Sequence, residues 1–457
     1  MKNKNEQPQD FGQVFKHSSP DMPCIERLED AGAPKVLRAE HLDHDAQYFL
    51  RLNNLLPKSV MAKASVKSMR KAWSLATRAM GSRPKVENVT NVEIDGPNGP
   101  IALRIFTPEV TDQLLPAFAW CFGGGFIIGD LESSESVGRH VPIGSGCITV
   151  AINYRLAPEH NITASREDVL AAMLWLGVHG EEYGIDSTRL ALGGDSAGGN
   201  LTAVVSQELH QRGDTSLKLQ VLVYPATELA AKFPSYGENI SGDYLLNAEA
   251  IELIETHLMP SMVAADPESP WISPRRCTDM SGLPPAMIIT AGYDPIRDHG
   301  IDYSARLRQA DVAVDLVHYA GLFHGFINLD NVIMGSRDAM ARMCLALMNA
   351  FNNEPAQNRT TEVADAPRGG NIAGAVVGEL ATLSLTTLGV AAGWQELALD
   401  SMPRKVHRLL RRILAPSLIT SSAIRNAGGK AMSNLTAVQT YGDVDLEVEM
   451  TEVALEY

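Results

Sequence analysis

The sequence lacks the features of several protein classes. Its five cysteines are scattered and odd in number, and none stands in a C-x-x-C pair. A disulfide framework or a zinc site is therefore not expected, and the pattern fits a reducing compartment. The N-terminal stretch is polar and has no apolar core of the kind that a secretory signal carries. Together these absences predict a cytoplasmic protein.

Long apolar runs and an excess of positive charge are also missing. No uninterrupted apolar stretch is long enough to span a bilayer, so stable membrane insertion is not expected. The formal net charge of −15 argues against nucleic acid or an anionic membrane surface as the main partner. The 457 residues, 45% hydrophobic and 20% charged, have the composition of a globular protein with a substantial core.

Sequence patterns divide the chain into three expected regions. Residues 1–85 begin with a polar, proline-containing stretch, loosely packed to about residue 34, and continue with helical patterns at 43–55 and 60–80 that would form a cap. Residues 86–352 form the main domain. Residues 353–457 form a C-terminal extension, partly disordered or helical, that starts with a linker-like composition at 352–370. Residues 403–414 predict a short basic amphipathic helix, which either docks on an acidic or lipid surface or has no role.

Strand and helix patterns alternate through the main domain. An Asn-Gly turn at 98–99 between two alternating runs predicts a hairpin. The alternation that follows indicates an α/β fold with a mostly parallel central sheet flanked by helices. Strands are expected at 117–122, 148–153, 189–192, 220–224, 286–291 and 313–317, and helices at 132–142, 165–178, 198–212, 299–310 and 336–351. Residues 228–270 interrupt the alternation and predict a second cap element with a helix at 247–258.

One turn of the main domain is expected to expose a serine. A short apolar strand leads into Gly-Asp-Ser-Ala-Gly-Gly-Asn at 194–200, and a helical pattern follows. In a G-x-S-x-G turn of this kind the serine hydroxyl stands above the sheet edge. Ser196 is therefore a candidate nucleophile. The alternative interpretation is an ordinary glycine-rich turn.

Two further loops supply partners for this serine. A serine hydroxyl attacks only if a base takes its proton and an acid orients that base. His324 lies in a glycine-flanked loop after the last expected strand, and Asp294 directly follows the strand at 286–291. An exposed loop histidine and a helix N-cap are the ordinary alternatives. The order serine, acid, histidine on strand-end loops favours the catalytic interpretation, with Asp298 as a substitute acid or a salt-bridge residue.

Three successive glycines, at 123–125, form the fourth candidate element. They follow the strand at 117–122 and precede an apolar Phe-Ile-Ile segment. Glycines in such a position let backbone N–H groups face a site where no side chain would fit. The stretch therefore predicts an oxyanion loop, with a flexible linker as the alternative.

These segments resemble the hormone-sensitive-lipase-like group of α/β-hydrolase carboxylesterases. The match comprises the segments 123–126, 154–160, 194–200, 294–298 and 324–326, and its domain spans about residues 85–352. The resemblance implies an α/β-hydrolase fold with Ser196 as nucleophile, Asp294 as acid and His324 as base. It also implies a helical cap over the substrate pockets, no metal or organic cofactor, and a homodimer as a family expectation.

The resemblance further implies an oxyanion hole built from the N–H groups of Gly124, Gly125 and Ala197. The family usually carries a histidine directly before the three glycines, and this chain has Phe122 there. Because that histidine braces the loop, its loss puts the rigidity of the loop in question and not the nucleophile.

The predicted function is that of a serine carboxylesterase acting on a small-molecule ester. It would cleave short-to-medium acyl or aryl esters through an acyl-enzyme, and the sequence assigns no residue to substrate recognition. Cleavage of lactone, carbamate or amide bonds at the same site is the first alternative. A non-enzymatic ligand-binding protein on the same scaffold is the second alternative.

Overall fold

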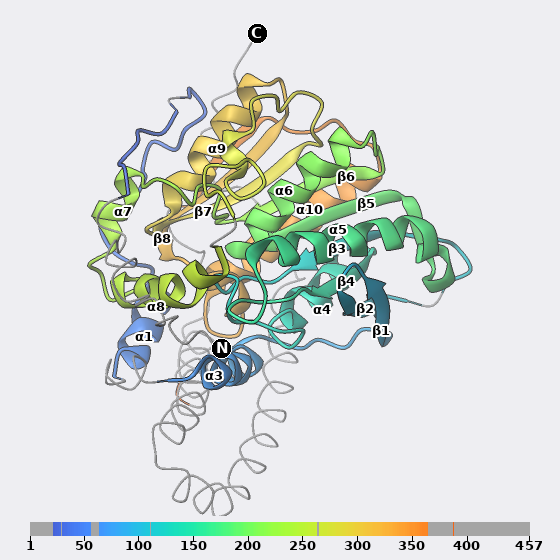
Figure 1. Ribbon diagram of the computed structural model, residues 1–457, viewed down its shortest axis with the longest axis horizontal. Coiled ribbons are helices and arrows are strands. Elements are labelled where there is room, and N and C mark those ends of the chain that lie inside the picture. The colour runs from blue at the N-terminus through green and yellow to red at the C-terminus, as the bar shows by residue number, and fades with distance from the viewer. Residues whose placement is uncertain are drawn as a thin grey trace, which may run out of the picture.

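The computed structural model describes residues 22–28, 30–55, 64–109, 111–262 and 265–363, together with Thr387. Within these residues a single mixed sheet has the strand order β1-β2-β4-β3-β5-β6-β7-β8-β9 (Figure 1). Its strands are β1 (Asn88–Gly96), β2 (Gly99–Thr107), β3 (Leu115–Cys121), β4 (Ile148–Asn153), β5 (Ile185–Asp195), β6 (Leu217–Val223), β7 (Ala286–Tyr293), β8 (Val314–Phe323) and β9 (Arg359–Val363).

The sheet has the mostly parallel character that the alternating pattern predicts. β1 and β2 form the expected antiparallel hairpin, and β2 pairs antiparallel with β4. All remaining neighbours, from β4 and β3 through to β8 and β9, are parallel. The carboxyl ends of β5, β7 and β8 therefore meet at one edge, where loops can carry a site.

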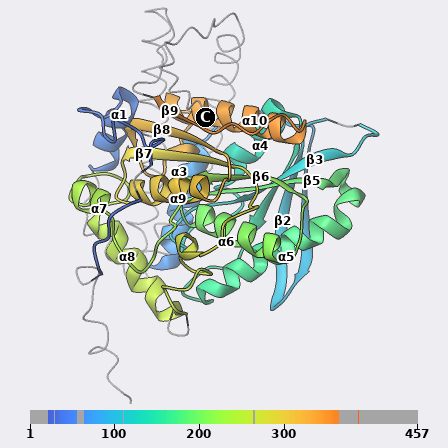
Figure 2. The ribbon, with the colours of Figure 1, turned by 90° about the horizontal axis from the view of Figure 1, so that it is seen from above.

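Helices cover both faces of the sheet, as Figure 2 shows. One face carries α4 (Glu135–Ser145) and α10 (Met334–Phe351), which pack on each other and on Phe118 and Trp120 of β3. The other face carries α5 (Ile162–His179), α6 (Ala197–Gln211) and α9 (Arg297–Gln309). Two apolar layers thus enclose strands that are buried on both faces, which confirms the α/β class.

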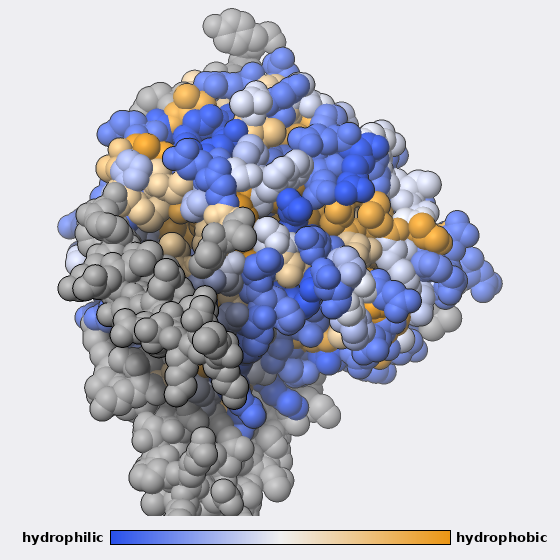
Figure 3. All heavy atoms as spheres, in the orientation of Figure 1, coloured by the Kyte–Doolittle hydropathy of each residue, from blue (hydrophilic) through white to orange (hydrophobic). Residues whose placement is uncertain are grey.

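The surface on the side of α5, α6 and α9 is largely hydrophilic, with small separate apolar patches (Figure 3). Leu174 and Val178 of α5 are exposed apolar side chains of this scattered kind, which are normal on a globular surface. In the parts of the chain that the structure describes, no helix has the length and apolar character needed to cross a membrane.

Four helices lie near the carboxyl ends of the strands. They are α1 (His44–Asn53), α3 (Val66–Met80), α7 (Pro234–Asn239) and α8 (Ala248–Leu258) (Figure 1). Met69 and Ala72 of α3 form a small apolar cluster with Leu253 of α8 and Ile128 of the glycine-rich loop. Helix α3 and the segment between β6 and β7 therefore meet at that loop.

Some sequence predictions differ from the structure. Residues 359–363 were expected in a linker but form β9, which pairs parallel with β8. The strand is half-buried and polar, so no apolar alternation marks it. Helix α7 was not predicted, because six residues with proline and glycine carry no helical period. The helix expected at 403–414, most of the 353–457 extension and residues 1–21 lie outside the described residues.

The polar stretch before residue 34 is also more tightly held than expected. Arg27 forms an ion pair with the buried Asp298, and the backbone N–H of Leu28 donates to Asp302 at 2.8 Å. The described part of this stretch is therefore fixed to helix α9 by polar contacts instead of apolar ones, which is why its composition does not reveal it.

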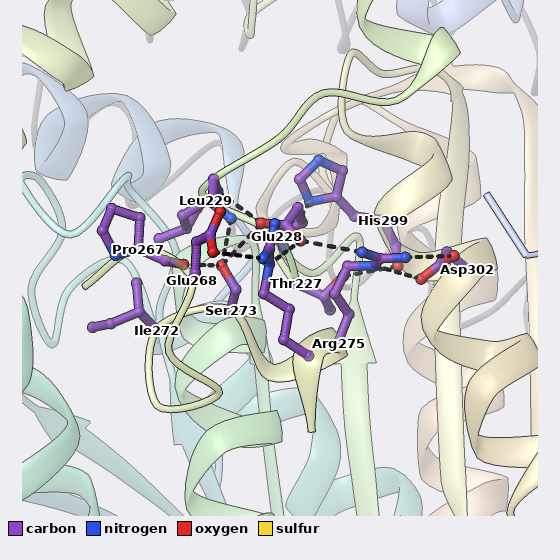
Figure 4. A network of polar contacts seen from close by, with 12 residues as sticks. Thr227, Glu228, Leu229, Pro267, Glu268, Ile272, Ser273, Arg275, His299 and Asp302 are labelled. Atoms are coloured by element: carbon purple, nitrogen blue, oxygen red, sulfur yellow. Dashed lines mark hydrogen bonds and ion pairs between the residues drawn. The ribbon is translucent and has the colours of Figure 1, made fainter. Parts of the chain in front are cut away.

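A buried ion-pair network joins the segment between β6 and β7 to helix α9 (Figure 4). Glu228 accepts a hydrogen bond from Arg276 Nε at 2.8 Å and lies 3.3 Å from Arg275 Nη1. Arg275 Nε also donates to Asp302 of α9 at 2.8 Å. Charges buried this deeply are tolerated only when paired and hydrogen-bonded. The network therefore fixes the segment between β6 and β7 to helix α9.

Removing the carboxylate of Asp302 is expected to lower the free energy of unfolding by about 3–5 kcal/mol, because the buried guanidinium of Arg275 loses the nearer of its two carboxylate partners. Burial alone would raise the pKa of Asp302, but hydrogen bonds and charge from Arg275 and Arg306 outweigh it and hold the pKa below its ordinary value of 3.8. The stabilisation is therefore present above about pH 4 and is lost as pH falls through the lower folded-state pKa.

Urea unfolding of Asp302→Ala at pH 7 and pH 3 tests both parts of this expectation. Glu268→Ala is the matched control, because Glu268 pairs with Arg276 in the same network at 3.5 Å but is 68% exposed. The control is expected to change stability by less than about 1 kcal/mol. An equal loss in both variants, or a difference from the unaltered protein that does not shrink at low pH, would contradict the assignment.

Candidate active site

Ser196 occupies the turn between β5 and α6. Its φ of 55° and ψ of −114° lie in a region that L residues seldom adopt. The turn is held by the Ser196 N–H, which donates to the carbonyl of Val223 at 2.9 Å. A Cβ on Gly198 would lie 2.0 Å from the carbonyl oxygen of Cys121, so only glycine fits at that position. This geometry is that of a nucleophile elbow.

The structure brings the three predicted side chains together in a hydrogen-bonded chain. Nε2 of His324 lies 2.8 Å from Ser196 Oγ, and Nδ1 of His324 lies 2.8 Å from Asp294 Oδ2. Asp294 and His324 are buried, and the other Asp294 oxygen accepts the N–H of Ile296 at 2.8 Å. The imidazole is thus positioned to take the serine proton on one nitrogen while the carboxylate holds the other.

The glycine-rich loop after β3 faces this chain. Gly124 and Gly125 have φ values of +132° and +60°. Among the described residues neither of their N–H groups donates a hydrogen bond, and the N–H of Ala197 at the start of α6 is likewise unbonded. Free N–H groups beside a nucleophile are what an oxyanion needs. The carbonyl of Gly124 instead accepts from Ile127 and Ile128, each at 3.0 Å.

Phe122 is held in the place where the family usually has histidine. Its ring stacks on Tyr154 with 4.4 Å between centroids and an angle of 20°. The Tyr154 hydroxyl donates to the backbone carbonyl of Phe122 at 2.5 Å. Both residues are almost completely buried. An aromatic stack and one hydrogen bond therefore fix the loop at this point without a histidine.

Asp195, the residue before the candidate nucleophile, holds the next peptide of the loop. Its Oδ1 accepts the N–H of Gly123 at 2.8 Å. Burial raises the pKa of Asp195 to about 6, although the Gly123 N–H and the nearby His324 oppose that rise. A carboxylate accepts an N–H more strongly when it is ionised than when it is protonated. The glycine-rich loop is therefore held most firmly above pH 6.

Arg70 of α3 is a contact that the sequence did not indicate. Its Nε donates to the carbonyl of Ile127 at 2.8 Å, and its Nη2 donates to the carbonyl of Ala157 at 2.8 Å. The same guanidinium pairs with Glu159 at 2.7 Å. One side chain of α3 thus ties the glycine-rich loop to residues 157–159. Its only signal in the sequence is a basic residue on an amphipathic helix, which usually marks a solvated face.

Asp298 lies apart from the hydrogen-bonded chain. Its carboxylate pairs with Arg297 Nε at 2.9 Å and accepts the N–H of Ser235 at 2.9 Å. This is the salt-bridge role, which was the preferred of its two interpretations. In the described residues no group of three or more His, Cys, Asp or Glu side chains is placed to hold a metal ion.

Replacing Gly124 with alanine is expected to lower kcat by about 10²–10³, with little change in KM. The new Cβ would lie 2.2 Å from the carbonyl oxygen of Ile128, so the loop must move. Its N–H groups would then no longer point toward the position of the oxyanion. Gly99→Ala is the matched control, because Gly99 has nearly the same φ of +130° and no neighbour within 4 Å of an added Cβ.

Steady-state kinetics of the Gly124 and Gly99 variants with p-nitrophenyl acetate separate the loss of oxyanion stabilisation from the effect of backbone strain. Both substitutions carry the same backbone strain, so both are expected to lower the melting temperature. Only Gly124→Ala is expected to lose turnover. Equal kcat values in the two variants would show that Gly124 does not contribute to the oxyanion hole.

A serine elbow, an aspartate and a histidine at the ends of β5, β7 and β8 of this sheet define an α/β hydrolase. Residues 118–328 match the family model described as alpha/beta hydrolase fold. The esterase LipI of Mycobacterium tuberculosis is 37% identical over 261 residues, which cover 57% of this chain and 81% of the relative. The chain belongs to the α/β-hydrolase family, in its hormone-sensitive-lipase-like group of carboxylic ester hydrolases.

Two further comparisons agree with this membership. The carboxylic ester hydrolase LipN of Mycobacterium tuberculosis is 35% identical over 328 residues, covering 70% of this chain and 86% of that protein. Among solved structures, an esterase of Pyrobaculum calidifontis is 34% identical with a TM-score of 0.59, covering 63% of this chain and 94% of that one. The chain therefore spans most of the length of these relatives.

Proposed function

We propose that this carboxylic ester hydrolase uses Ser196 as its nucleophile, His324 as its base and Asp294 as the acid that holds the imidazolium. The observation that carries the proposal is the continuous hydrogen-bonded chain from Ser196 Oγ through both nitrogens of His324 to the Asp294 carboxylate, each step 2.8 Å long. Its substrate is a small-molecule ester with a short-to-medium acyl or an aryl group.

The first half of the reaction forms an acyl-enzyme. His324 Nε2 takes the hydroxyl proton as Ser196 Oγ bonds to the ester carbonyl carbon. The carbonyl oxygen becomes an oxyanion, which the N–H groups of Gly124, Gly125 and Ala197 stabilise. The tetrahedral intermediate then collapses, and the protonated His324 gives its proton to the departing alkoxide.

The second half returns the serine. Water, deprotonated by His324, attacks the acyl carbon, and a second oxyanion forms in the same position. As the carboxylic acid leaves, the proton returns from the imidazolium to Ser196 Oγ. Throughout, Asp294 stays ionised and hydrogen-bonded to Nδ1, which keeps Nε2 free to accept a proton.

Covalent labelling tests this proposal directly. A fluorophosphonate probe reacts with a serine only if a neighbouring base activates it, so labelling of the intact chain is expected on the tryptic peptide that contains Ser196. An unlabelled chain would instead support a ligand-binding protein on a hydrolase scaffold. Turnover is then compared for p-nitrophenyl esters, a lactone, a carbamate and an anilide. The fastest turnover is expected with a short ester. Faster turnover of the lactone, carbamate or anilide would show that esters are not the preferred substrate class.

The location that we propose is the cytoplasm. The support is that all five cysteines are unpaired thiols in the structure, two of them at partly or fully exposed positions. An oxidising compartment would leave such exposed thiols open to disulfide exchange. Fractionation of the producing cells with a cytoplasmic marker enzyme tests the assignment.

A further inference from the structure

We propose that Tyr224 is a positioning residue that aligns Ser196 with His324. The inference rests on the proposed function, because it concerns the geometry of that same site. Tyr224 directly follows β6, the strand between those that carry the nucleophile and the acid, and its side chain is completely buried. Three separate contacts connect it to the elements that the reaction needs.

The backbone around Tyr224 holds the nucleophile turn from both sides. The N–H of Ser196 donates to the carbonyl of Val223 at 2.9 Å, and the N–H of Ala226 donates to the carbonyl of Ser196 at 3.2 Å. Between them Tyr224 has a φ of 34°, a value that non-glycine residues seldom adopt. Its own N–H donates to Ile289 of β7 at 2.6 Å. The segment after β6 therefore holds the backbone of Ser196 in place.

The side chain of Tyr224 holds the histidine loop at two points. Its ring lies against the imidazole of His324, with 4.6 Å between centroids and an angle of 53°. Its hydroxyl oxygen accepts the N–H of Ile327, three residues further along the chain, at 3.2 Å. The ring thus limits rotation of the imidazole, and the hydroxyl fixes the loop that carries it.

The charge of Asp195, the residue beside the nucleophile, also acts on this hydroxyl, and the same carboxylate accepts the N–H of Gly123 in the glycine-rich loop. Burial, together with the charge of Asp195, raises the pKa of Tyr224 well above its ordinary value. The hydroxyl therefore keeps its proton and remains a neutral acceptor for the N–H of Ile327. One residue thus connects the elbow, through its backbone, with the histidine loop, through its side chain.

A residue needed only for its volume would not require this hydroxyl. Phenylalanine has the same ring and would fill the same space, but it would leave the Ile327 N–H without its partner in a buried place. The loss would loosen the histidine loop relative to Ser196. Small displacements at reacting groups cost rate more than binding, because the transition state needs the closer alignment.

Two variants of Tyr224 and one control test the inference. Tyr224→Phe removes the hydroxyl and keeps the ring, and Tyr224→Leu removes both. Tyr303→Phe is the matched control, because Tyr303 of α9 is also completely buried and its hydroxyl accepts from Gln207 at 3.1 Å, away from the site. The measurements are kcat and KM with p-nitrophenyl acetate, the rate of fluorophosphonate labelling, and the melting temperature.

Tyr224→Phe is expected to lower kcat and the labelling rate about tenfold, and Tyr224→Leu about a hundredfold, with KM within about twofold of the unaltered protein. Tyr303→Phe is expected to lower only the melting temperature. Unchanged kcat in Tyr224→Phe, a rise in KM alone, or an equal loss in Tyr303→Phe would overturn the inference. If the unaltered chain neither labels nor turns over the ester, the proposed function fails, and the Tyr224 inference fails with it.

Discussion

Replacing Ser196 with alanine is expected to lower kcat for p-nitrophenyl acetate by about 10⁶-fold. The variant removes the proposed nucleophilic oxygen and leaves the oxyanion loop in place. Alanine and serine have the same backbone preferences, so the strained turn at φ 55° should persist and the protein should still fold. Burst kinetics and steady-state turnover of the purified variant measure the loss.

Ser206→Ala provides the matched control for this experiment. Ser206 is buried in α6, the helix that begins directly after Ser196. Its Oγ has no hydrogen-bond partner among the described residues. Its loss is expected to leave kcat unchanged. Turnover that survives in Ser196→Ala at more than a small fraction of the original rate would show that another group carries the reaction.

Replacing Asp294 with asparagine is expected to lower kcat by about 10⁴-fold. The amide has nearly the same shape, but its NH₂ group can donate to His324 Nδ1, now 2.8 Å from a carboxylate oxygen. The imidazole then carries its proton on Nε2, which faces Ser196, and it can no longer act as a base. The KM should change little, because neither side chain is assigned a role in ground-state binding.

Asp298→Asn distinguishes the role of Asp294 from that of Asp298, which lies in the first turn of α9. Burial would raise the pKa of Asp298, but the charge and hydrogen bonds of Arg297 lower it, so the carboxylate is held as one half of an ion pair. The variant is expected to lower the melting temperature and to change kcat by less than about threefold. A large loss of kcat in Asp298→Asn, with Asp294→Asn still active, would reverse the assignment of the acid.

The candidate residues could be predicted because each lies directly after an apolar strand. Ser196, Asp294 and His324 follow β5, β7 and β8, and parallel strands bring such ends to one edge. Their order along the chain, serine then acid then histidine, is that of α/β hydrolases and supported the same prediction. The distances between the side chains could not be predicted, because they depend on registers between strands that are far apart in sequence.

The support of the site was much less visible in the sequence. Tyr154 lies 32 residues from Phe122, and Arg70 lies 57 residues from Ile127, so neither contact leaves a local pattern. Phe122 alone suggested a loop without its usual brace. In the structure Phe122 stacks on Tyr154 instead. Tyr224 had a local signal, since it also follows a strand, but a tyrosine after an apolar run ordinarily indicates core.

Strand β9 was missed for a different physical reason. Thr360, Thr361 and Glu362 are polar, and a strand at a sheet edge needs no apolar alternation to pair. Its hydrogen bonds run to residues 315–319 of β8, and Glu362 accepts the N–H groups of Lys35 and Val36 at 2.8 and 3.0 Å. These partners are about 45 and 325 residues away, beyond the reach of any window along the sequence.

The presence of β9 also limits how two copies of this chain can assemble. An uncovered strand edge is a template on which another chain can add a strand. Along residues 315–319 that edge of β8 is already paired with residues 359–363 of the same chain. Two sheets therefore cannot join at β8 to form one continuous sheet while β9 remains in place. A dimer built from the described residues would therefore need a different surface, and a truncation before residue 359 would leave the edge of β8 unpaired and open to strand addition.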